Sequence, residues 1–260
     1  MTAGMKLDYS NKVVWITGAS SGIGRELALS FANDGAIVAA SARSKDKLDA
    51  IAQLSPNIHA FPLDVTDAEA ASRVTGEIAR ALGPVDLAIL NAGIFHPMTV
   101  SRYDADKVRA SNAINYLGVV NSLEPVMAAM VARKAGHIAI VSSVAGFRGL
   151  PKGVAYAPTK AALISLAESL YPDLKLKGVR MTIINPGYVA TPMTEPVTFP
   201  MPFIIPVDQA VAEIRNGIAS GRFEIVFPWR MKWLMKTMRV LPYGAFFYLM
   251  GLIAKREPPP

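Results

Sequence analysis

The chain has 260 residues, of which 52% are apolar, which suits one α/β domain with a substantial core and excludes a disordered protein. It contains no cysteine, which excludes disulfides and thiolate metal sites, and its three histidines are scattered, so we expect no metal. The net charge of +7 suits a phosphate-bearing ligand or an anionic surface, and no basic run followed by an apolar stretch opens the chain, so we expect a cytoplasmic protein.

Short apolar runs rich in β-branched residues alternate with helical patterns along most of the chain. We expect a helix over 23–33 and strands over 13–17, 36–42, up to 63–65, 85–91, 138–142, 179–185 and 224–227. Continuously apolar strands indicate a sheet covered on both faces, and strand–helix alternation indicates parallel strands. The sequence therefore predicts a doubly wound α/β fold with about seven parallel strands over 1–227 and a helical C-terminal extension over 228–260.

A glycine-rich segment lies between the first expected strand and the first helix. It reads Thr17-Gly18-Ala19-Ser20-Ser21-Gly22-Ile23-Gly24. Glycines there let the turn tighten and the backbone approach a pyrophosphate, while the helix N-terminus offers free N–H groups and partial positive charge. A glycine triplet also occurs in ordinary tight turns, but this placement favours a dinucleotide-binding loop. The expected contacts are Gly18, Ser20, Ser21, Gly22, Ile23 and Gly24.

The residues after the second expected strand indicate which dinucleotide binds. An acid there would bond a free ribose 2′-hydroxyl, whereas an arginine accommodates a 2′-phosphate. Residues 39–44 include Arg43 and no acid, and Ser41, Ser44 and Lys45 are close to this arginine in the sequence. We therefore expect NADP(H) rather than NAD(H); the alternative is that Arg43 is a solvated loop charge.

Further candidate contacts follow the third and fourth expected strands. Asp64, with Val65 beside it, could bond an adenine amino group or could cap the following helix. Asn91, Ala92 and Gly93 end the fourth strand with small residues, which suits backbone that lies against a cofactor.

A tyrosine and a lysine form the most specific catalytic pattern. Tyr156 and Lys160 are spaced to share one face of a helix, and Pro158 between them places the pair at a helix start. A nearby ammonium and an oxidised nicotinamide would lower the pKa of Tyr156 and make it a general acid or base. Ser143, after the fifth strand, could polarise a substrate oxygen, whereas Ser142 is expected to face the core or a helix cap.

With these motifs in this order, the chain resembles the short-chain dehydrogenase/reductases over roughly 12–227. The resemblance implies a Rossmann fold, hydride transfer at nicotinamide C4, and a catalytic tetrad of Asn115, Ser143, Tyr156 and Lys160. It further implies that Asn115 holds a water that links Lys160 to solvent, and that Lys160 binds the nicotinamide ribose. It also assigns the nicotinamide pocket to Pro186, Gly187, Val189 and Thr191.

The segment 192–206 is rich in Pro, Met and Phe, and in the family it is the lid over the substrate. Apolar, adaptable side chains suit an apolar substrate, and they could also simply cover the core. We expect a lipid-like, cyclic or aromatic ketone or secondary alcohol. The expected substrate contacts are His96, Phe147, Tyr188, Met193, Phe199 and Phe203.

The sequence after Phe227 departs from the family pattern. Residues 229–239 interleave basic residues with Trp, Met and Leu, and the nearly apolar run 240–254 precedes Lys255-Arg256. That run is too short, and too broken by Pro242 and Gly244, to span a bilayer. Two alternatives stay open: residues 229–256 contact a membrane peripherally at its inner face, or they form a helical flap over the pocket or against a second subunit.

The sequence thus predicts an NADP(H)-dependent oxidoreductase that acts on an apolar carbonyl or alcohol, with Tyr156 as general acid/base, in a homodimer or tetramer. An alternative of another class is a non-catalytic NADP(H)-binding sensor or regulator; the presence of both Tyr156 and Lys160 favours the enzyme. We expect no nucleic-acid partner, because no basic groove studded with aromatic residues occurs before the extension.

Overall fold

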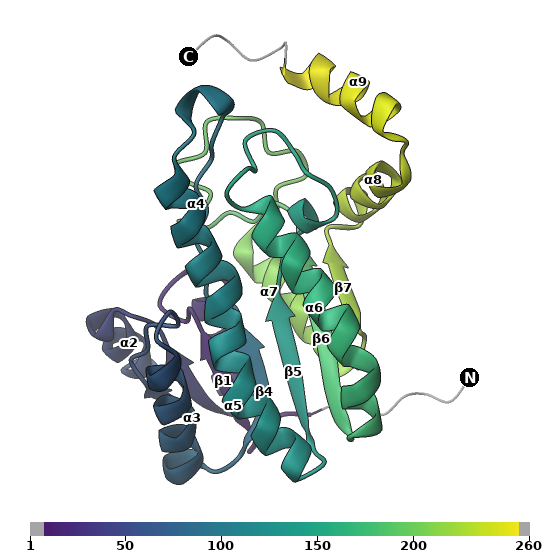
Figure 1. The fold of residues 1–260 in the computed structure, drawn as a ribbon. Helices are drawn as coiled ribbons and strands as arrows, with labels where there is room; N and C mark the ends of the chain where they lie inside the picture. The colour runs from purple at the N-terminus through teal and green to yellow at the C-terminus, as the bar shows by residue number, and fades with distance from the viewer. Residues whose placement is uncertain (1–7, 255–260) are drawn as a thin grey trace.

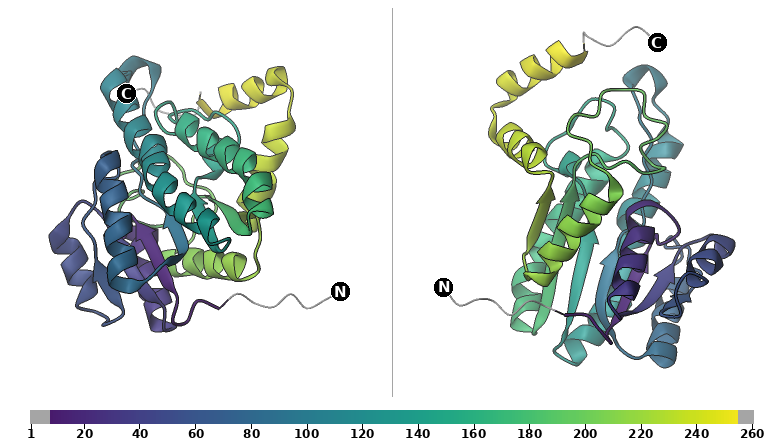
Figure 2. Two further views of the ribbon diagram at one scale, coloured as in Figure 1. Left: turned by 60° about the horizontal axis from the view of Figure 1, so that its bottom comes forward. Right: turned by 180° about the vertical axis from the view of Figure 1, so that it is seen from behind.

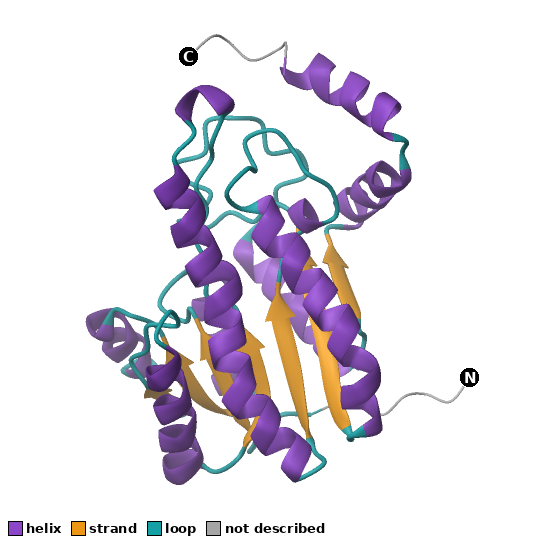
Figure 3. Ribbon diagram, in the orientation of Figure 1, coloured by secondary structure: helices purple, strands orange, loops and turns teal. Residues whose placement is uncertain are grey.

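A parallel sheet lies between two layers of helices in the computed structural model, which describes residues 8–254 (Figures 1 and 3). Within that range the sheet has seven strands in the order β3-β2-β1-β4-β5-β6-β7. The strands are β1 Val13–Thr17, β2 Ile37–Ser41, β3 Ile58–Ala60, β4 Val85–Leu90, β5 Gly136–Val141, β6 Val179–Pro186 and β7 Glu224–Phe227. The chain order reverses between β1 and β4, which is the point at which doubly wound sheets bind ligands.

The two helical layers each cover a buried face of the sheet. One layer contains α1 Gly22–Asn33, α2 Lys45–Ala52 and α7 Val207–Ala219, and the other contains α3 Ala68–Leu82, α4 Ala105–Asn112, α5 Gly118–Ala132 and α6 Ala157–Leu176. In β1, Val13 and Trp15 pack toward α3, α5 and α6, whereas Val14 and Ile16 pack toward α1 and α7. The predicted doubly wound fold is confirmed. Successive side chains of a strand alternate between the two faces, and because helices cover both faces, the positions on both faces of such a strand are mostly apolar.

The third strand ends earlier than the sequence predicts. We expected it to run to 63–65, but β3 stops at Ala60. The chain still follows β2 for a few residues, since the amides of Phe61 and Leu63 donate to the carbonyl oxygens of Ala40 and Ala42 at 2.9 and 3.0 Å. The residue between them is a proline whose nitrogen faces away from β2, so the two bonds continue the pairing beyond the last residue of β3.

A long helix forms the centre of one layer. α4, a π-helical turn η2 (Ala113–Leu117) and α5 together make the stretch Ala105–Ala132, the one helix in the described part of the chain that is long and apolar enough to cross a membrane by length and composition. Core helices meet the same criterion. Here α5 packs Val119, Leu123 and Val126 against the sheet, as a core helix does.

The extension folds into two helices at the carboxyl end of the sheet. After β7 the chain forms α8 (Trp229–Val240) and α9 (Tyr243–Ala254), which lie above the sheet in Figure 1 and are seen from behind in Figure 2. α8 buries Met231, Met235 and Met238, whereas α9 buries Phe246. The predicted helical extension is present; Lys255-Arg256 and the residues that follow lie outside the described range.

Candidate active site

The glycine-rich loop packs tightly against the end of β4. Gly18 has a φ of 69°, and a Cβ on Gly24 would lie 2.3 Å from the Gly18 carbonyl oxygen, so neither position accepts a side chain. The Asn91 carboxamide donates to the carbonyl oxygens of Thr17 and Gly18 at 3.1 and 3.3 Å. Asn91 therefore holds the loop in shape, a role that its position among small residues did not suggest.

The start of α1 is open toward an anion. Ser21 makes no side-chain cap, and the first turn of α1 carries no acidic residue. Its backbone N–H groups and the helix dipole are thus available to a pyrophosphate. The predicted phosphate contacts lie around this point, except that Gly24 sits beneath the loop as a packing position.

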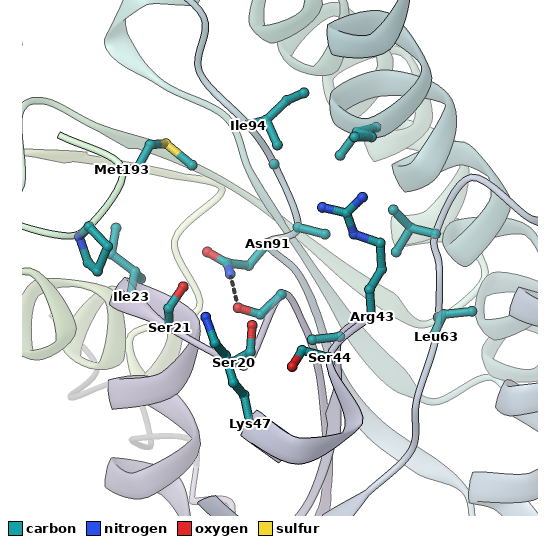
Figure 4. Close-up of a pocket in the computed structure, with 18 of the residues that line it drawn as sticks. Ser20, Ser21, Ile23, Arg43, Ser44, Lys47, Leu63, Asn91, Ile94 and Met193 are labelled. Atoms are coloured by element: carbon teal, nitrogen blue, oxygen red, sulfur yellow. Dashed lines mark hydrogen bonds between the residues drawn. The ribbon is translucent and has the colours of Figure 1, made fainter. Parts of the chain in front are cut away.

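A cavity of about 630 Å³ runs from this loop across the end of the sheet (Figure 4). Arg43, Ser44 and Lys47 line one end of it together with Ser20. Two arginine or lysine side chains and two hydroxyls there form a suitable set of donors for a phosphate. The cavity thus fits a dinucleotide, with donors for a phosphate group at this end.

The neighbours that we expected to assist Arg43 differ in part. Ser41 is buried and accepts a hydrogen bond from Trp15 Nε1 at 3.0 Å, and Lys45 pairs with Asp49 at 2.5 Å, outside the cavity. Lys47 takes the place predicted for Lys45. Which lysine faces the cavity depends on the residue at which α2 begins, and no helix was predicted there from the sequence.

The remaining wall of the cavity comes from the loops after β3 and β4. Its described lining includes Asp64, Val65, Asn91, Ala92, Gly93 and Thr191. The capping alternative for Asp64 is wrong, because Asp67 caps α3 by accepting from the amide of Ala70 at 2.9 Å. Burial raises the pKa of Asp64, but hydrogen bonds from Thr66 and the charge of Arg43 outweigh it, so the carboxyl pKa is lowered.

A second cavity, of about 410 Å³, joins the first. Both are lined by Ile23, Asn91, Gly93, Thr191 and Met193. The second cavity also contains Ser143, Tyr156, Lys160, Pro186, Gly187 and Val189. Of the residues predicted to shape the nicotinamide pocket, Thr191 therefore lies where the two cavities meet, and the other three line the second cavity.

Tyr156 and Lys160 stand at the start of α6, as the proline between them predicts. Tyr156 is the N-cap residue. The Lys160 ammonium donates to the Val141 carbonyl oxygen at 2.9 Å and lies 5.4 Å from the centre of the Tyr156 ring. The Ser143 hydroxyl donates to the Pro186 carbonyl oxygen at 3.3 Å, while Ser142 donates to the Lys160 carbonyl oxygen at 2.7 Å. Ser143 thus lines the cavity, and Ser142 supports the helix start.

Asn115 lies in the π-helical turn between α4 and α5 and is fully buried. Its carboxamide accepts from the Ile94 amide at 2.7 Å and donates to the Ile94 carbonyl at 3.0 Å and to Thr159 at 3.3 Å. A Cβ on Gly93 would lie 3.3 Å from Asn115 Oδ1 and 3.7 Å from Lys160 Nζ, so these two groups approach each other across Gly93. π-Helical turns recur at functional sites, and this one holds Asn115 near Gly93, which Lys160 also approaches.

Burial sets the protonation of the catalytic pair. It raises the pKa of Tyr156 to about 12, with the Ser143 hydroxyl opposing the shift, and lowers the pKa of Lys160 to about 8. The sequence predicted that an ammonium and an oxidised nicotinamide would together lower the tyrosine pKa. In the protein alone, burial raises this pKa instead. At neutral pH the phenol is neutral and the ammonium is largely charged.

Half of the predicted substrate contacts line the second cavity. Tyr188, Met193 and Phe199 do so. His96, Phe147 and Phe203 do not line this cavity.

The position of each of these three residues has a local cause. Neighbouring side chains of an irregular segment point in different directions, so Phe95 rather than His96 lines the cavity, with its ring 5.1 Å from that of Tyr156. Phe147 is buried in the core. Phe203 is partly exposed, and the Arg230 guanidinium lies 5.8 Å from the centre of its ring.

The C-terminal helices close the second cavity. α8 and α9 contribute Met231, Leu234, Met235, Met238 and Met250 to its lining. A Cβ on Gly187 would lie 2.9 Å from Met231 Cγ, so this glycine also permits the close approach of α8. The inner surfaces of α8 and α9 thus form the flap over the pocket that was one alternative for the extension, and membrane contact by residues 229–256 stays a prediction.

Arg148 fastens this flap to the loop that follows Ser143. Its guanidinium donates to the carbonyl oxygens of Arg239 and Leu241, both at 3.2 Å, and lies 4.5 Å from the ring centres of Tyr243 and Phe246. A second tie is the ion pair between Lys236 on α8 and Glu224 on β7. The loop after Ser143 is thus in direct contact with the helices that form one wall of the second cavity.

A dinucleotide-sized cavity at the switch point of a doubly wound sheet, ending at a buried tyrosine–lysine pair, defines a nicotinamide-dependent oxidoreductase. The sequence profile described as short chain dehydrogenase matches residues 12–200, and the chain belongs to this family.

Known proteins resemble the chain over most of its length. An uncharacterized oxidoreductase of Myxococcus xanthus (strain DK1622) is 38% identical over 243 residues, which cover 92% of this chain and 96% of the relative. The 11-beta-hydroxysteroid dehydrogenase-like 3 of Arabidopsis thaliana is 34% identical, over 90% of this chain and 79% of the relative. A short chain dehydrogenase of Burkholderia cenocepacia J2315, crystallised with NADP, has the same fold: its TM-score is 0.81 at 24% identity, over 97% of this chain and 100% of that chain.

Proposed function

We propose that this protein is an NADP(H)-dependent oxidoreductase that transfers hydride between nicotinamide C4 and the carbonyl or secondary alcohol carbon of an apolar substrate. The observation that carries the proposal is the second cavity, which joins the first and in which Ser143, Tyr156 and Lys160 line a space with mostly apolar walls. A polar reacting group and an apolar body would both be accommodated there.

The choice of NADP(H) is supported by the donors at the far end of the first cavity. Arg43 and Lys47 supply positive charge, and the segment after β2 offers no acid to a free ribose 2′-hydroxyl. The complex of the Burkholderia cenocepacia protein with NADP agrees with this choice. When bound, the reduced cofactor supplies the hydride; the open N-terminus of α1 binds its pyrophosphate.

Tyr156 moves the proton. During ketone reduction the substrate oxygen takes the proton of the neutral phenol as the substrate carbon accepts hydride, and Ser143 donates a hydrogen bond to the same oxygen. Lys160, whose ammonium is held by the Val141 carbonyl, stabilises the resulting phenolate by its charge. Asn115 fixes the Ile94 backbone beside the lysine. Alcohol oxidation uses the same groups in reverse.

The apolar character of the substrate is supported by the walls of the second cavity. Methionines from α8 and α9 and aromatic side chains such as Phe95 and Phe199 surround the reacting end. Methionine adapts to irregular shapes, which suits a bulky cyclic or lipid-like molecule. The printed name of the Arabidopsis thaliana relative, a hydroxysteroid dehydrogenase-like protein, agrees with such a substrate.

The test is to follow NADPH and NADH oxidation at about 340 nm with ketones of graded chain length and ring size, alongside a fluorescence titration of NADPH binding. We expect turnover with NADPH that improves with apolar bulk. NADPH binding without turnover of any ketone, or of the matching alcohols with NADP⁺, would contradict the enzyme and favour a sensor. Turnover that improves with polar ketones would contradict the apolar substrate alone.

A further inference from the structure

The outer surfaces of α8 and α9 expose large aromatic and apolar side chains; we call them the α8–α9 face. Those exposed most are Trp229, Trp233, Val240, Tyr243, Phe247 and Tyr248, each between 61% and 79% exposed. The inner surfaces are used otherwise, since they line the second cavity and the core. Large exposed apolar side chains gathered on two consecutive helices normally mark a site of interaction.

Basic charge accompanies this face without acidic charge. Between residues 228 and 254 the sequence contains four basic residues and no Asp or Glu. Lys236 pairs with Glu224 of β7, whereas Arg230 and Arg239 are exposed. The Arg230 guanidinium lies 5.4 Å from the centre of the Trp229 ring, so aromatic and cationic groups are presented side by side. This combination suits the headgroup region of an anionic bilayer.

The dimensions favour a helix pair that lies on a membrane. α9 has 12 residues, or about 18 Å of helix, against about 30 Å for a bilayer core. α8 is of equal length and is turned away from α9 at the Leu241-Pro242 elbow, which Arg148 holds. Neither helix can span a bilayer, but both can place aromatic side chains at its surface.

A second copy of the chain fits the same face less well. In a symmetric dimer through α8 and α9, the exposed arginines of both copies would meet on a face whose residues 228–254 include no acid. Like charges would then be desolvated together at a cost. An anionic lipid surface neutralises the same charges.

We propose that the α8–α9 face docks this protein on the surface of an anionic lipid membrane. The inference goes beyond the proposed chemistry and does not depend on it. Because Leu234, Met238 and Met250 of the same helices line the second cavity, docking places that cavity next to the lipid. An apolar ligand could then enter without crossing bulk water.

The experiment measures binding of the full chain to sedimented vesicles made of phosphatidylcholine alone or of equal parts phosphatidylcholine and phosphatidylglycerol. We expect binding to the mixed vesicles that weakens with added salt, and much weaker binding to phosphatidylcholine. Arg230→Gln combined with Arg239→Gln should lower the partition coefficient about 25-fold. Trp229→Ser combined with Trp233→Ser should also lower it at least about tenfold.

The matched control is Leu176→Ser with Lys177→Gln, which changes an exposed apolar residue and its basic neighbour at the C-terminal end of α6. It should bind the mixed vesicles like the unaltered chain. Failure of the unaltered chain to bind, or equal loss in control and test variants, would overturn the proposal. A dimer in lipid-free sedimentation velocity that Trp229→Ser with Trp233→Ser dissociates would assign the face to a second copy and likewise overturn it.

Discussion

The first cavity is lined mainly by short segments that follow strands β1 to β4, within 18–23, 42–47, 63–65 and 91–94. The second cavity is closed by residues from 186–202 and 231–250. In the first, short local motifs expose backbone and a few charges to a polar ligand. In the second, side chains from distant segments are held together by Arg148 and by the ion pair between Lys236 and Glu224 of β7. The difference teaches that a shared cofactor site can be built locally, while substrate selection is left to long-range packing.

The largest effect should come from the junction of the two cavities. Tyr156→Phe removes the proton that the substrate oxygen receives, so kcat should fall by about 10³ or more while NADPH affinity changes little. Steady-state kinetics and a fluorescence titration measure the two effects. Tyr103→Phe, at an exposed tyrosine, is the control and should leave kcat unchanged. Retained turnover in Tyr156→Phe would remove the tyrosine from the chemistry.

A change confined to the first cavity should alter the cofactor preference and leave the substrate alone. Arg43→Ala with Lys47→Ala removes the charged donors, so the ratio of kcat/KM for NADPH to that for NADH should fall about 100-fold. Lys45→Ala, which changes a lysine outside the cavity, should leave the ratio as it was. An unchanged ratio in the double variant would refute the 2′-phosphate site.

A change confined to the second cavity should do the opposite. Arg148→Met removes two hydrogen bonds and two ring contacts from the α8–α9 elbow, so KM for the best ketone should rise about tenfold while NADPH binding is kept. α8 and α9 should also become more sensitive to limited proteolysis. Arg222→Met, at an exposed arginine before β7, should show neither effect. Equal losses for ketone and NADPH would mean that Arg148 supports the whole fold.

The smallest effect on activity should come from a residue remote from both cavities. His137 of β5 bonds with Tyr9 at 2.7 Å and Thr182 at 2.8 Å, and burial lowers its pKa to about 3 from 6.5. Below pH 6.5 the unfolded chain thus binds a proton that the folded chain refuses until about pH 3. The free energy of unfolding should therefore decrease as the pH is lowered through this window, by up to about 1.4 kcal/mol per pH unit.

Urea unfolding from neutral pH to about pH 4 measures this slope. His137→Gln should flatten it, because the variant cannot take up the proton, and should leave both ligand affinities unchanged. A variant that keeps the slope of the unaltered chain would show that other groups cause the acid sensitivity.

Much of the fold and of the candidate site could be predicted from the sequence because the signals are local. Apolar runs gave strand positions close to those observed, and the proline between Tyr156 and Lys160 indicated the start of α6. The errors occur where a neighbour decides direction. Phe95 replaces His96, and Lys47 replaces Lys45, because one residue of register in a loop or a helix start turns a side chain toward the cavity or away from it.

The sequence by itself determined the doubly wound sheet, the glycine-rich loop and the pairing of Tyr156 with Lys160, since periodicity, glycine and helical spacing act within a few residues. Only the tertiary structure decided that Asn115 and Lys160 both lie beside Gly93 and that α8 closes the second cavity. Those contacts join segments far apart along the chain, and their free energy depends on how whole elements pack. No short pattern encodes such packing, which is why only the folded chain showed that the extension covers the pocket.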